Sequence, residues 1–371
     1  MTNPGPLRED LARLKEVDRI LLGSAFALFA IGVISVFSAL AGRGELAMSL
    51  AVRQVVWGLM GSVAFLLTFT AGFERMLKYA YWLYGAALLT LLILLVFGYT
   101  AKGATSWFDF GAFRFQPSEP TKVALSLVLA VFLCRYPPKS IVNILGVAMV
   151  SSLAAILVLL QPDLGGVLVY AFMIFIALIV AGTPGRYVFL LAGIFLLSLP
   201  LGWSILKEYQ KLRIMVFFDP YIDPLGAGYN VIQSRITVGS GGILGKGFLA
   251  GSQTKLHFLP EAHTDFIFSV FSEEFGFVGA SLVLLLFAVL LWRMIRTAAR
   301  TGDERGKILV TSISAWIWFQ AFVNIAMAVG IAPVTGLALP FVSYGGSSLV
   351  SLGAALGLVQ SVHVWSKRQY E

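Results

Sequence analysis

The sequence predicts an all-α polytopic membrane protein with about ten transmembrane helices. Of its 371 residues, 58% are hydrophobic and only 12% are charged. A soluble domain carries roughly 25% charged residues, so this chain has too few charges to cover a surface in contact with water. Several apolar stretches also reach the roughly 20 residues that a helix needs to cross the hydrocarbon core. Composition and the length of the apolar runs therefore favour the same fold class.

Ten apolar runs are the predicted spans: 20–41, 54–72, 79–98, 118–135, 141–160, 167–182, 187–205, 266–292, 308–331 and 346–364. The first run follows a charged segment, residues 1–19, and is longer than the roughly 7–15 residues of a signal-peptide core. We therefore interpret it as a retained span. A single membrane domain, residues 20–365, then precedes a short tail, residues 366–371.

The basic residues predict the orientation of the chain. The net charge is +8, but the lysines and arginines lie scattered between apolar runs and form no stripe, which argues against nucleic acid as a partner. In a multi-pass membrane protein, an excess of Lys and Arg marks the cytoplasmic side. With a cytoplasmic N-terminus, that side holds 16 of them: Arg8, Arg13, Lys15, Arg19, Arg75, Lys78, Arg135, Lys139, Arg186, Arg293, Arg296, Arg300, Arg305, Lys307, Lys367 and Arg368. The short outer loops hold five: Arg43, Arg53, Lys102, Arg114 and Lys122.

Both termini are therefore predicted to be cytoplasmic, in a protein of the cell (inner) membrane. One long extracytoplasmic loop, about 206–264, connects spans seven and eight. Its basic residues are set aside, because long segments cross a membrane largely regardless of charge. A connection of this length is usually functional. Amphipathic pieces such as residues 229–238 are expected to form short helices at the membrane surface.

The same loop contains a glycine-rich segment, VGSGGILGKG, at residues 238–247. It is not a Walker A loop, because Ser240 stands where that motif needs its first glycine. Two interpretations remain open. Consecutive backbone N–H groups could bind an anion with help from Lys246, or the segment is a plain flexible turn.

Charged residues gather at the predicted outer ends of the spans. Glu119 and Lys122 open the fourth span three residues apart, on one helical face, and are expected to pair, with Ser118 as a helix cap. This pair either stabilises the interface or lines a polar substrate cavity. Asp163, in the turn at 161–166, either caps the next helix or lines the same cavity.

Asp265 lies where the long loop enters the eighth span, followed directly by aromatic and aliphatic residues. A carboxylate at such a boundary is partly desolvated, which makes it a better base. The alternative is that Asp265 or Thr264 caps the helix. Glu273 lies about 80° round the same helix from Asp265. Ser343, in the small-residue segment 339–348, either allows close helix packing or lines the outer cavity.

The sequence does not favour a metal site or an internal disulfide. The three histidines are too dispersed for a metal site, and the single cysteine, Cys134, cannot form an internal disulfide. No cofactor is predicted, and a requirement for a divalent metal stays open.

Six segments, taken together, resemble the SEDS family (shape, elongation, division and sporulation). The matching stretches are FQPSEPTK at 115–122, QPDLG at 161–165, DPLGAGYNVIQSRI at 223–236, GSGG and GKG within 239–247, FLPEAHTDFIF at 258–268 and PFVSYGGSS at 340–348. The resemblance covers about residues 20–365. The residues within these motifs resemble those of the elongation branch more than those of the division branch. Ser106 departs from the family, whose members often have arginine just before the position of Trp107.

The resemblance implies an inverting peptidoglycan glycosyltransferase. Its substrate would be lipid II, a disaccharide-peptide on undecaprenyl pyrophosphate, polymerised at the outer face of the membrane during cell elongation. Implied partners are a class B penicillin-binding protein and other membrane proteins of cell elongation. Asp265 matches the family's catalytic aspartate and would be the general base.

A pyrophosphate leaving group gains negative charge, so nearby cations would stabilise its departure. The candidates are Lys122, Arg213, Arg235 and Lys246. The other proposed substrate-binding residues are Glu119, Asp163, Glu273 and Ser343.

Three rival interpretations remain. A flippase for lipid-linked precursors needs polar groups along its whole path, including the membrane midplane. Here they crowd one end of the spans, which favours an enzyme. A scaffold that only recruits the crosslinking partner would not explain the boundary carboxylate. A member of the division branch would perform the same chemistry.

Overall fold

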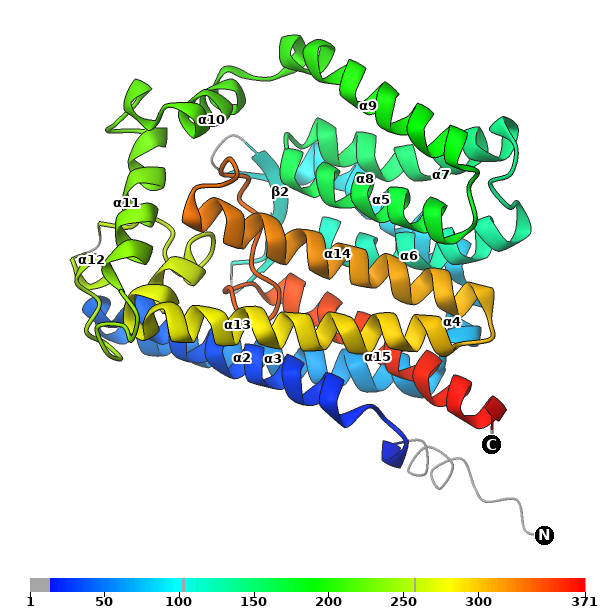
Figure 1. Cartoon of the computed structure of the whole chain (residues 1–371), viewed down its shortest axis with the longest axis horizontal. Coiled ribbons are helices and arrows are strands. Elements are labelled where there is room, and N and C mark those ends of the chain that lie inside the picture. Colours follow the sequence, from blue (N-terminus) through cyan, green and yellow to red (C-terminus); the bar gives the residue numbers. More distant parts are fainter. Residues whose placement is uncertain (1–13, 102–103, 112, 257, 371) are drawn as a thin grey trace.

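The computed structural model describes residues 14–101, 104–111, 113–256 and 258–370 (Figure 1). A helix stands at each of the ten predicted spans: α2 (Arg19–Ala39), α3 (Glu45–Ala71), α5 (Ala80–Phe97), α6 (Ser118–Arg135), α7 (Ile141–Leu160), α8 (Leu164–Val180), α9 (Gly185–Ile205), α13 (Ile267–Arg300), α14 (Glu304–Val329) and α15 (Gly346–Tyr370). The helical fold class is confirmed. Most of the predicted N-terminal segment, residues 1–13, and the last residue of the tail lie outside the described residues.

Eight of these helices are long and apolar enough to cross a membrane. The other two are α8, which has only 17 residues, and α6, whose sequence includes Glu119, Lys122 and Arg135. The span count of ten therefore stays a prediction, with α6 and α8 as the helices on which it depends.

Shorter elements connect the spans. The 3-10 turn η1 (Ala41–Arg43) and the helix α4 (Phe73–Lys78) flank α3. The long loop contains α10 (Glu208–Phe218), η2 (Pro220–Ile222), α11 (Ala227–Ser240) and α12 (Ser252–Lys255), which confirms a helix over 229–238. An antiparallel sheet of β1 (Tyr99–Ala101), β2 (Ala104–Asp109) and β3 (Arg114–Phe115) was not predicted, because strands of two to six residues are too short to show a period.

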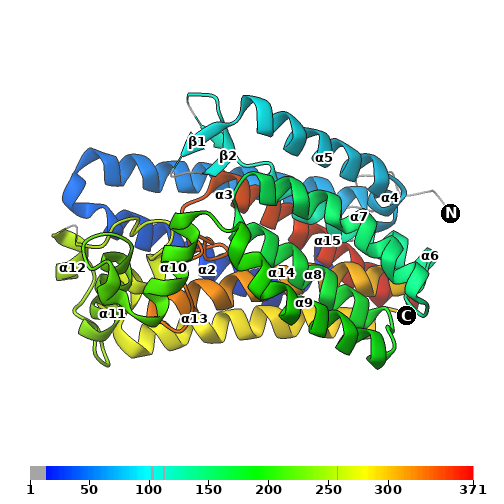
Figure 2. The same cartoon turned by 90° about the horizontal axis from the view of Figure 1, so that it is seen from above.

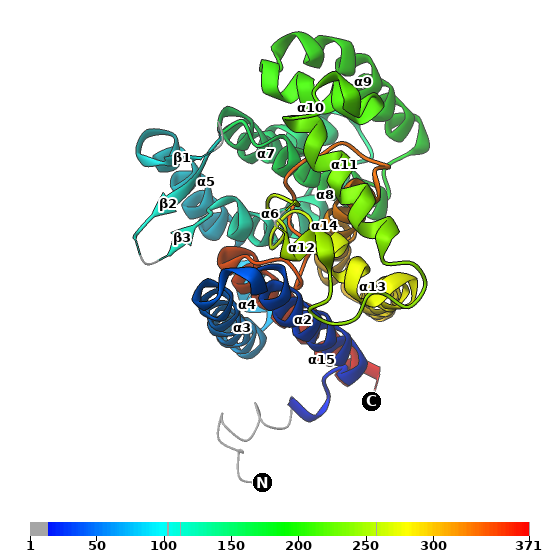
Figure 3. The ribbon, with the colours of Figure 1, turned by 90° about the vertical axis from the view of Figure 1, so that its left-hand side faces the viewer.

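The start of α2 and the end of α15 lie at one end of the bundle, and α10, α11 and α12 lie at the other (Figure 1). Figure 3, viewed onto that second end, shows α11 crossing it. An ion pair joins the two ends of the described chain, since Arg368 Nε and Nη2 lie 2.8 and 3.0 Å from the Glu16 carboxylate. Close by, Asp18 caps α2 and accepts a hydrogen bond from Arg293 Nε at 2.6 Å. A first and a last span that begin and end on one side are what an even number of spans requires.

The core forms around α14, which packs against α6, α8 and α13, while α3 packs along α15 and α2 along α13. These contacts bury the apolar faces of α14 and α15, whereas no described residue of α9 is buried. Figure 1 shows α9 along the upper edge of the bundle, and in Figure 2, which looks down on that edge, α9 lies in front of the other helices. An apolar helix with so little protein contact is stable in this position because lipid, and not water, surrounds it.

The helix α13 is broken at Gly276, whose φ and ψ are 65° and −161°. The break frees backbone groups that the glycine-rich segment then satisfies. Phe277 N–H and Val278 N–H donate to the carbonyls of Gly242 and Ile243, while the N–H groups of Lys246 and Gly247 donate to those of residues 273 and 274. Inside a membrane protein each unpaired backbone group is costly, so this exchange is what permits the break.

Gly276→Ala is expected to lower the free energy of unfolding by about 2–5 kcal/mol, because a Cβ would meet a backbone that cannot move away. It would stand 2.3 Å from Gly245 N and 2.5 Å from Ile243 O, at a positive φ. Thermal unfolding in detergent measures the loss. Gly239→Ala is the matched control, because a Cβ there meets nothing within 4 Å. Equal unfolding midpoints for the two variants would contradict this account.

Candidate functional site

Asp265 lies in the turn of residues 261–266, directly before α13. Neither Asp265 nor Thr264 caps that helix, because its N-cap position is Phe266 and no side chain bonds to it. The capping alternative is therefore wrong. The Asp265 backbone is held on both sides, since its N–H donates to the Glu261 carbonyl at 3.1 Å and its carbonyl accepts from Asn324 Nδ2 at 2.9 Å.

Asn324 connects this turn to the segment between α14 and α15. The residue is fully buried in α14, and its Nδ2 also donates to the Leu337 carbonyl at 2.7 Å. Its Oδ1 is buried and has no hydrogen-bond partner among the described residues. One side chain thus fixes the Asp265 backbone and the facing segment relative to each other.

Ser343 strengthens the same connection. Its hydroxyl donates to the Thr264 carbonyl at 2.6 Å and accepts from Leu339 N–H at 2.8 Å. The next residue, Tyr344, donates its N–H to the His263 carbonyl at 3.0 Å. The Ser343 hydroxyl is therefore engaged with backbone in both directions. We expected Ser343 to bind substrate, and its contacts instead favour a positioning role.

Gly336 faces the Asp265 carboxylate from that segment. A Cβ at Gly336, where φ is +74°, would lie 3.8 Å from Asp265 Oδ2. On its other side the segment touches the start of α8, because a Cβ at Gly165 would lie 3.0 Å from Thr335 O. The segment 335–337 therefore bridges the turn at 161–166 and Asp265.

Asp163 caps α8, which was one of the two alternatives, by accepting a hydrogen bond from Gly166 N–H at 2.8 Å. Burial raises the pKa of the Asp163 carboxyl, while the Gly166 N–H and the charge of Lys122 act in the opposite direction. Glu119 raises this pKa and Arg213 lowers it, more weakly. These four charged side chains therefore form one electrostatic cluster, which we name the Asp163 cluster.

Within this cluster, Glu119 and Lys122 form the predicted ion pair, with 2.6 Å between Lys122 Nζ and Glu119 Oε1. Both residues are buried, Lys122 with only 2% of its surface exposed. Lys122 Nζ also donates to Gln320 Oε1 at 3.2 Å and lies 4.7 Å from the centre of the Trp316 ring. The second carboxylate oxygen, Glu119 Oε2, is buried without a hydrogen-bond partner among the described residues. Ser118 does not cap α6, whose N-cap is Pro117.

A second ion pair, which the sequence did not predict, joins Lys246 to Glu273, which is fully buried. Lys246 Nζ lies 2.7 Å from Glu273 Oε1 and 2.8 Å from the hydroxyls of Ser240 and Ser252. Gln253 N–H donates to the same carboxylate oxygen at 3.0 Å. An ammonium group has three N–H donors, so these partners use all of them. Together with the backbone bonds to the break in α13, these contacts hold the glycine-rich segment against α13. Lys246 Nζ has no N–H donor left for an anion, so the anion-binding alternative is not supported.

The other two cation candidates differ in position. Arg235 is exposed on α11, and its Nη2 donates to the carbonyl of Gly330 at 3.0 Å, at the C-terminal end of α14. Arg213 lies on α10, which is held over the turn at 161–166 by hydrogen bonds from Tyr209 and Gln210 to the Pro162 carbonyl. Of the four cations, Lys122 and Arg213 belong to the Asp163 cluster.

Three residues of this site were not singled out from the sequence: Asn324, Gln320 and Trp316. A signal for two of them was present. Gln320 and Asn324 are amides four residues apart in an apolar run, hence on one helical face, and a polar group inside a span needs a reason. Their partners come from other helices, so their roles required the structure.

A family model described as a cell cycle protein, and named for FtsW, RodA and SpoVE, matches residues 18–368. The chain is 42% identical over 292 residues to the peptidoglycan glycosyltransferase MrdB of Escherichia coli K12. The alignment covers 78% of this chain and 79% of that protein. It is 36% identical over 363 residues to a probable peptidoglycan glycosyltransferase FtsW of Geobacter metallireducens, covering 94% and 96%.

Solved structures agree with the sequence comparisons. A chain from a study of how a peptidoglycan synthase complex coordinates polymerization and crosslinking has a TM-score of 0.80 and 38% identity, covering 94% of this chain and 97% of that one. The rod shape determining protein RodA of Thermus thermophilus has a TM-score of 0.71 and 33% identity, covering 96% and 98%.

Proposed function

Because this chain belongs to the SEDS family of FtsW, RodA and SpoVE, we propose that it polymerises lipid II with Asp265 as the general base. The chain is a multi-pass membrane protein and a peptidoglycan glycosyltransferase. The observation that supports the role of Asp265 is its setting. Two segments far apart in the sequence, 258–268 and 335–344, are hydrogen-bonded to each other around it.

The acceptor in this reaction is a sugar hydroxyl, whose own acidity is far too low for attack at neutral pH. In the proposed step, an Asp265 carboxylate oxygen takes the hydroxyl proton as the acceptor oxygen bonds to the anomeric carbon of the donor. The bond from that carbon to the pyrophosphate oxygen breaks, and undecaprenyl pyrophosphate leaves with the electron pair. In-line displacement inverts the anomeric centre.

Glycine at position 336 adds no side chain of its own to the space beside the Asp265 carboxylate. A base must come within about 2.6–3.2 Å of the proton that it removes, so this space matters for catalysis. Charge on the leaving pyrophosphate calls for a cation, and we assign that role to Arg213, with further positive charge in the same cluster from Lys122, which is paired with Glu119.

Incubation of the purified protein with lipid II, followed by separation of the products by length, tests the proposed function. Glycan strands are expected from the chain alone, and their absence with and without a class B penicillin-binding protein would contradict polymerisation. Transport of labelled lipid II across vesicles without any polymer would favour the flippase. We propose an elongation role and a crosslinking partner by analogy with the relatives, which include a peptidoglycan synthase complex.

We also propose that the end of the bundle that carries α10–α12 faces outward. A membrane-impermeant maleimide tests this in intact cells, after the single cysteine is replaced by Cys134→Ala. Asp109→Cys, in the exposed sheet, is expected to be labelled in intact cells. The control is Glu304→Cys, at the exposed start of α14, which is expected to be labelled only after lysis. The reverse pattern would invert the proposed topology.

Asn324→Leu is expected to lower kcat by about 10²-fold while KM changes little, because it releases the backbone that positions the base. Two buried carbonyls, those of Asp265 and Leu337, would lose their donors. Steady-state kinetics well below the unfolding temperature measures the effect. Asn143→Leu, at a half-buried site in α7 where Nδ2 donates to the Pro137 carbonyl, is the matched control, because it also removes an amide donor but lies away from the Asp265 turn. An unchanged kcat together with a lowered unfolding midpoint would assign Asn324 a purely structural role.

A further inference from the structure

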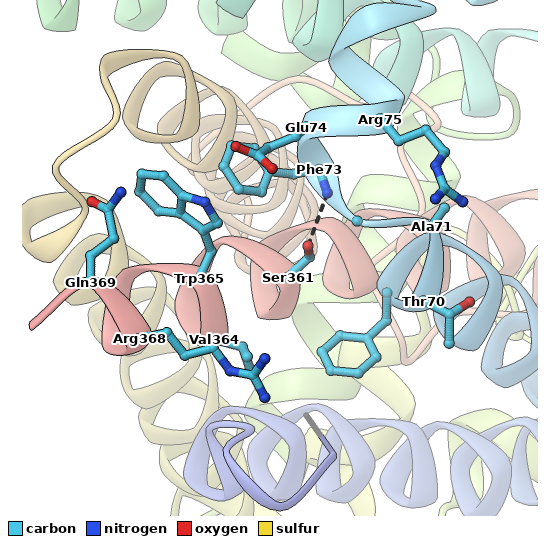
Figure 4. Close-up of a pocket in the computed structure, with 12 residues that line it drawn as sticks. Thr70, Ala71, Phe73, Glu74, Arg75, Ser361, Val364, Trp365, Arg368 and Gln369 are labelled. Atoms are coloured by element: carbon cyan, nitrogen blue, oxygen red, sulfur yellow. Dashed lines mark hydrogen bonds between the residues drawn. The ribbon is translucent and has the colours of Figure 1, made fainter. Parts of the chain in front are cut away.

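A cavity of about 360 Å³ opens between the end of α3, the start of α4 and the end of α15 (Figure 4). These parts lie at the end of the bundle opposite to α10–α12 (Figure 1). One wall is the end of α3 and the start of α4, residues 69–75. The other wall is the last turns of α15, with Ser361, Val364, Trp365, Arg368 and Gln369. Ligand sites in proteins are typically about 300–1,000 Å³, so the volume suits a small molecule or a headgroup.

The two walls are joined at the base of the cavity. At Gly72, where φ is +80°, the chain turns from α3 into α4. The next N–H, that of Phe73, donates to Ser361 Oγ at 2.9 Å, and the Phe73 ring stands edge-on to Trp365 with 5.5 Å between centres. The hollow is therefore a product of helix packing, and does not depend on a loop.

The inner lining of the cavity is apolar, and two arginines lie at its rim. Phe69, Phe73 and Val364 are buried, while Arg75 and Arg368 are exposed. Arg368 is paired with Glu16, whereas Arg75 forms no hydrogen bond or ion pair with any residue that the structure describes. The single carboxylate of the lining, Glu74, lies within electrostatic range of Arg305. Of the two rim arginines, Arg75 is therefore the one whose guanidinium is not paired with a carboxylate of the described residues.

We infer that this cavity binds the phosphate group of an acidic phospholipid, from the leaflet on the side of the termini. Guanidinium groups match phosphate oxygens in geometry and charge, and basic pockets between transmembrane helices bind acidic headgroups. Trp365 lies in the last turns of α15, and tryptophan is enriched where transmembrane helices end at the membrane–water interface. Beside the cavity, Leu66 and Leu67 of α3 are exposed, which provides an apolar surface for the acyl chains.

The test is a lipid titration of the full chain in detergent, with binding measured by native mass spectrometry and by the unfolding midpoint. Dioleoyl phosphatidylglycerol is expected to bind and raise the midpoint, whereas dioleoyl phosphatidylcholine and inorganic phosphate are expected to do neither. Arg75→Gln is expected to weaken phosphatidylglycerol binding by about tenfold, because a charge-assisted contact is lost. Arg186→Gln, another exposed arginine at the start of α9, should bind as wild type does.

A second variant tests the cavity without a change of charge. Ala71→Phe, on the partly buried end of α3, fills the space and is expected to reduce phosphatidylglycerol binding to the level of non-specific detergent exchange. Its unfolding midpoint without lipid shows whether the fold is kept. Equal binding by wild type and both variants would overturn the site. Binding of inorganic phosphate as tightly as the lipid would overturn the lipid as its occupant.

Discussion

Asp265→Asn is expected to slow lipid II polymerisation by about 10²–10⁴-fold, the usual contribution of a positioned base. The amide has nearly the shape of the carboxylate, but it cannot accept the proton of the attacking hydroxyl. The backbone bonds of this residue, to Glu261 and Asn324, do not involve the side chain and should persist. Loss of rate is therefore expected without loss of fold.

The measurement is the rate of glycan strand formation by purified wild type and variant, with thermal unfolding of both. Asp109→Asn is the matched control, since it makes the same chemical change at an exposed residue that pairs with Arg114 across the small sheet. It should polymerise at nearly the wild-type rate. An Asp265→Asn rate within twofold of wild type would mean that another group is the base.

Lys122→Met is expected to lower the free energy of unfolding by about 3–5 kcal/mol, because it leaves a buried carboxylate without its cation. Glu119 is buried, and one of its oxygens already lacks a partner among the described residues. Gln320 would lose a donor in the same change. Chemical or thermal unfolding in detergent measures the loss.

The double variant Glu119→Gln/Lys122→Met separates stability from function. Removing both charges takes away the uncompensated carboxylate, so the unfolding midpoint should recover most of the loss. We expect polymerisation to stay below about a tenth of wild type, because the Asp163 cluster has lost one of the cations proposed to stabilise the leaving group. Full activity in the double variant would assign the pair a purely structural role.

The pair Glu208 and Lys211 offers a matched control. These residues are also three apart in a helix, with 2.9 Å between Lys211 Nζ and Glu208 Oε1, but the Glu208 side chain is 89% exposed. A surface pair contributes only about 0–1 kcal/mol. Glu208→Gln/Lys211→Met should therefore alter neither stability nor polymerisation by a large factor.

Much of the fold could be predicted because a membrane acts on each segment by itself. An apolar run long enough to span lipid must be helical, whatever its neighbours, since only a helix satisfies its own backbone there. The helices at all ten apolar runs follow from this rule. The break in α13 does not, because it depends on carbonyl and N–H groups of residues 242–247 that lie beside it only in the folded chain.

The sequence by itself determined the class of fold, the segments that carry chemistry and, through resemblance, Asp265 as the residue to test. Tertiary structure alone decided what each polar residue contacts. Lys246 and Glu273 join the glycine-rich segment to α13, Ser343 bonds to backbone, and Asn324 fixes the Asp265 turn against Leu337. The physical reason is the distance along the sequence over which each effect acts. Hydropathy and helix formation are local, whereas a buried polar group must find its partner in space, and that partner can stand anywhere in the sequence.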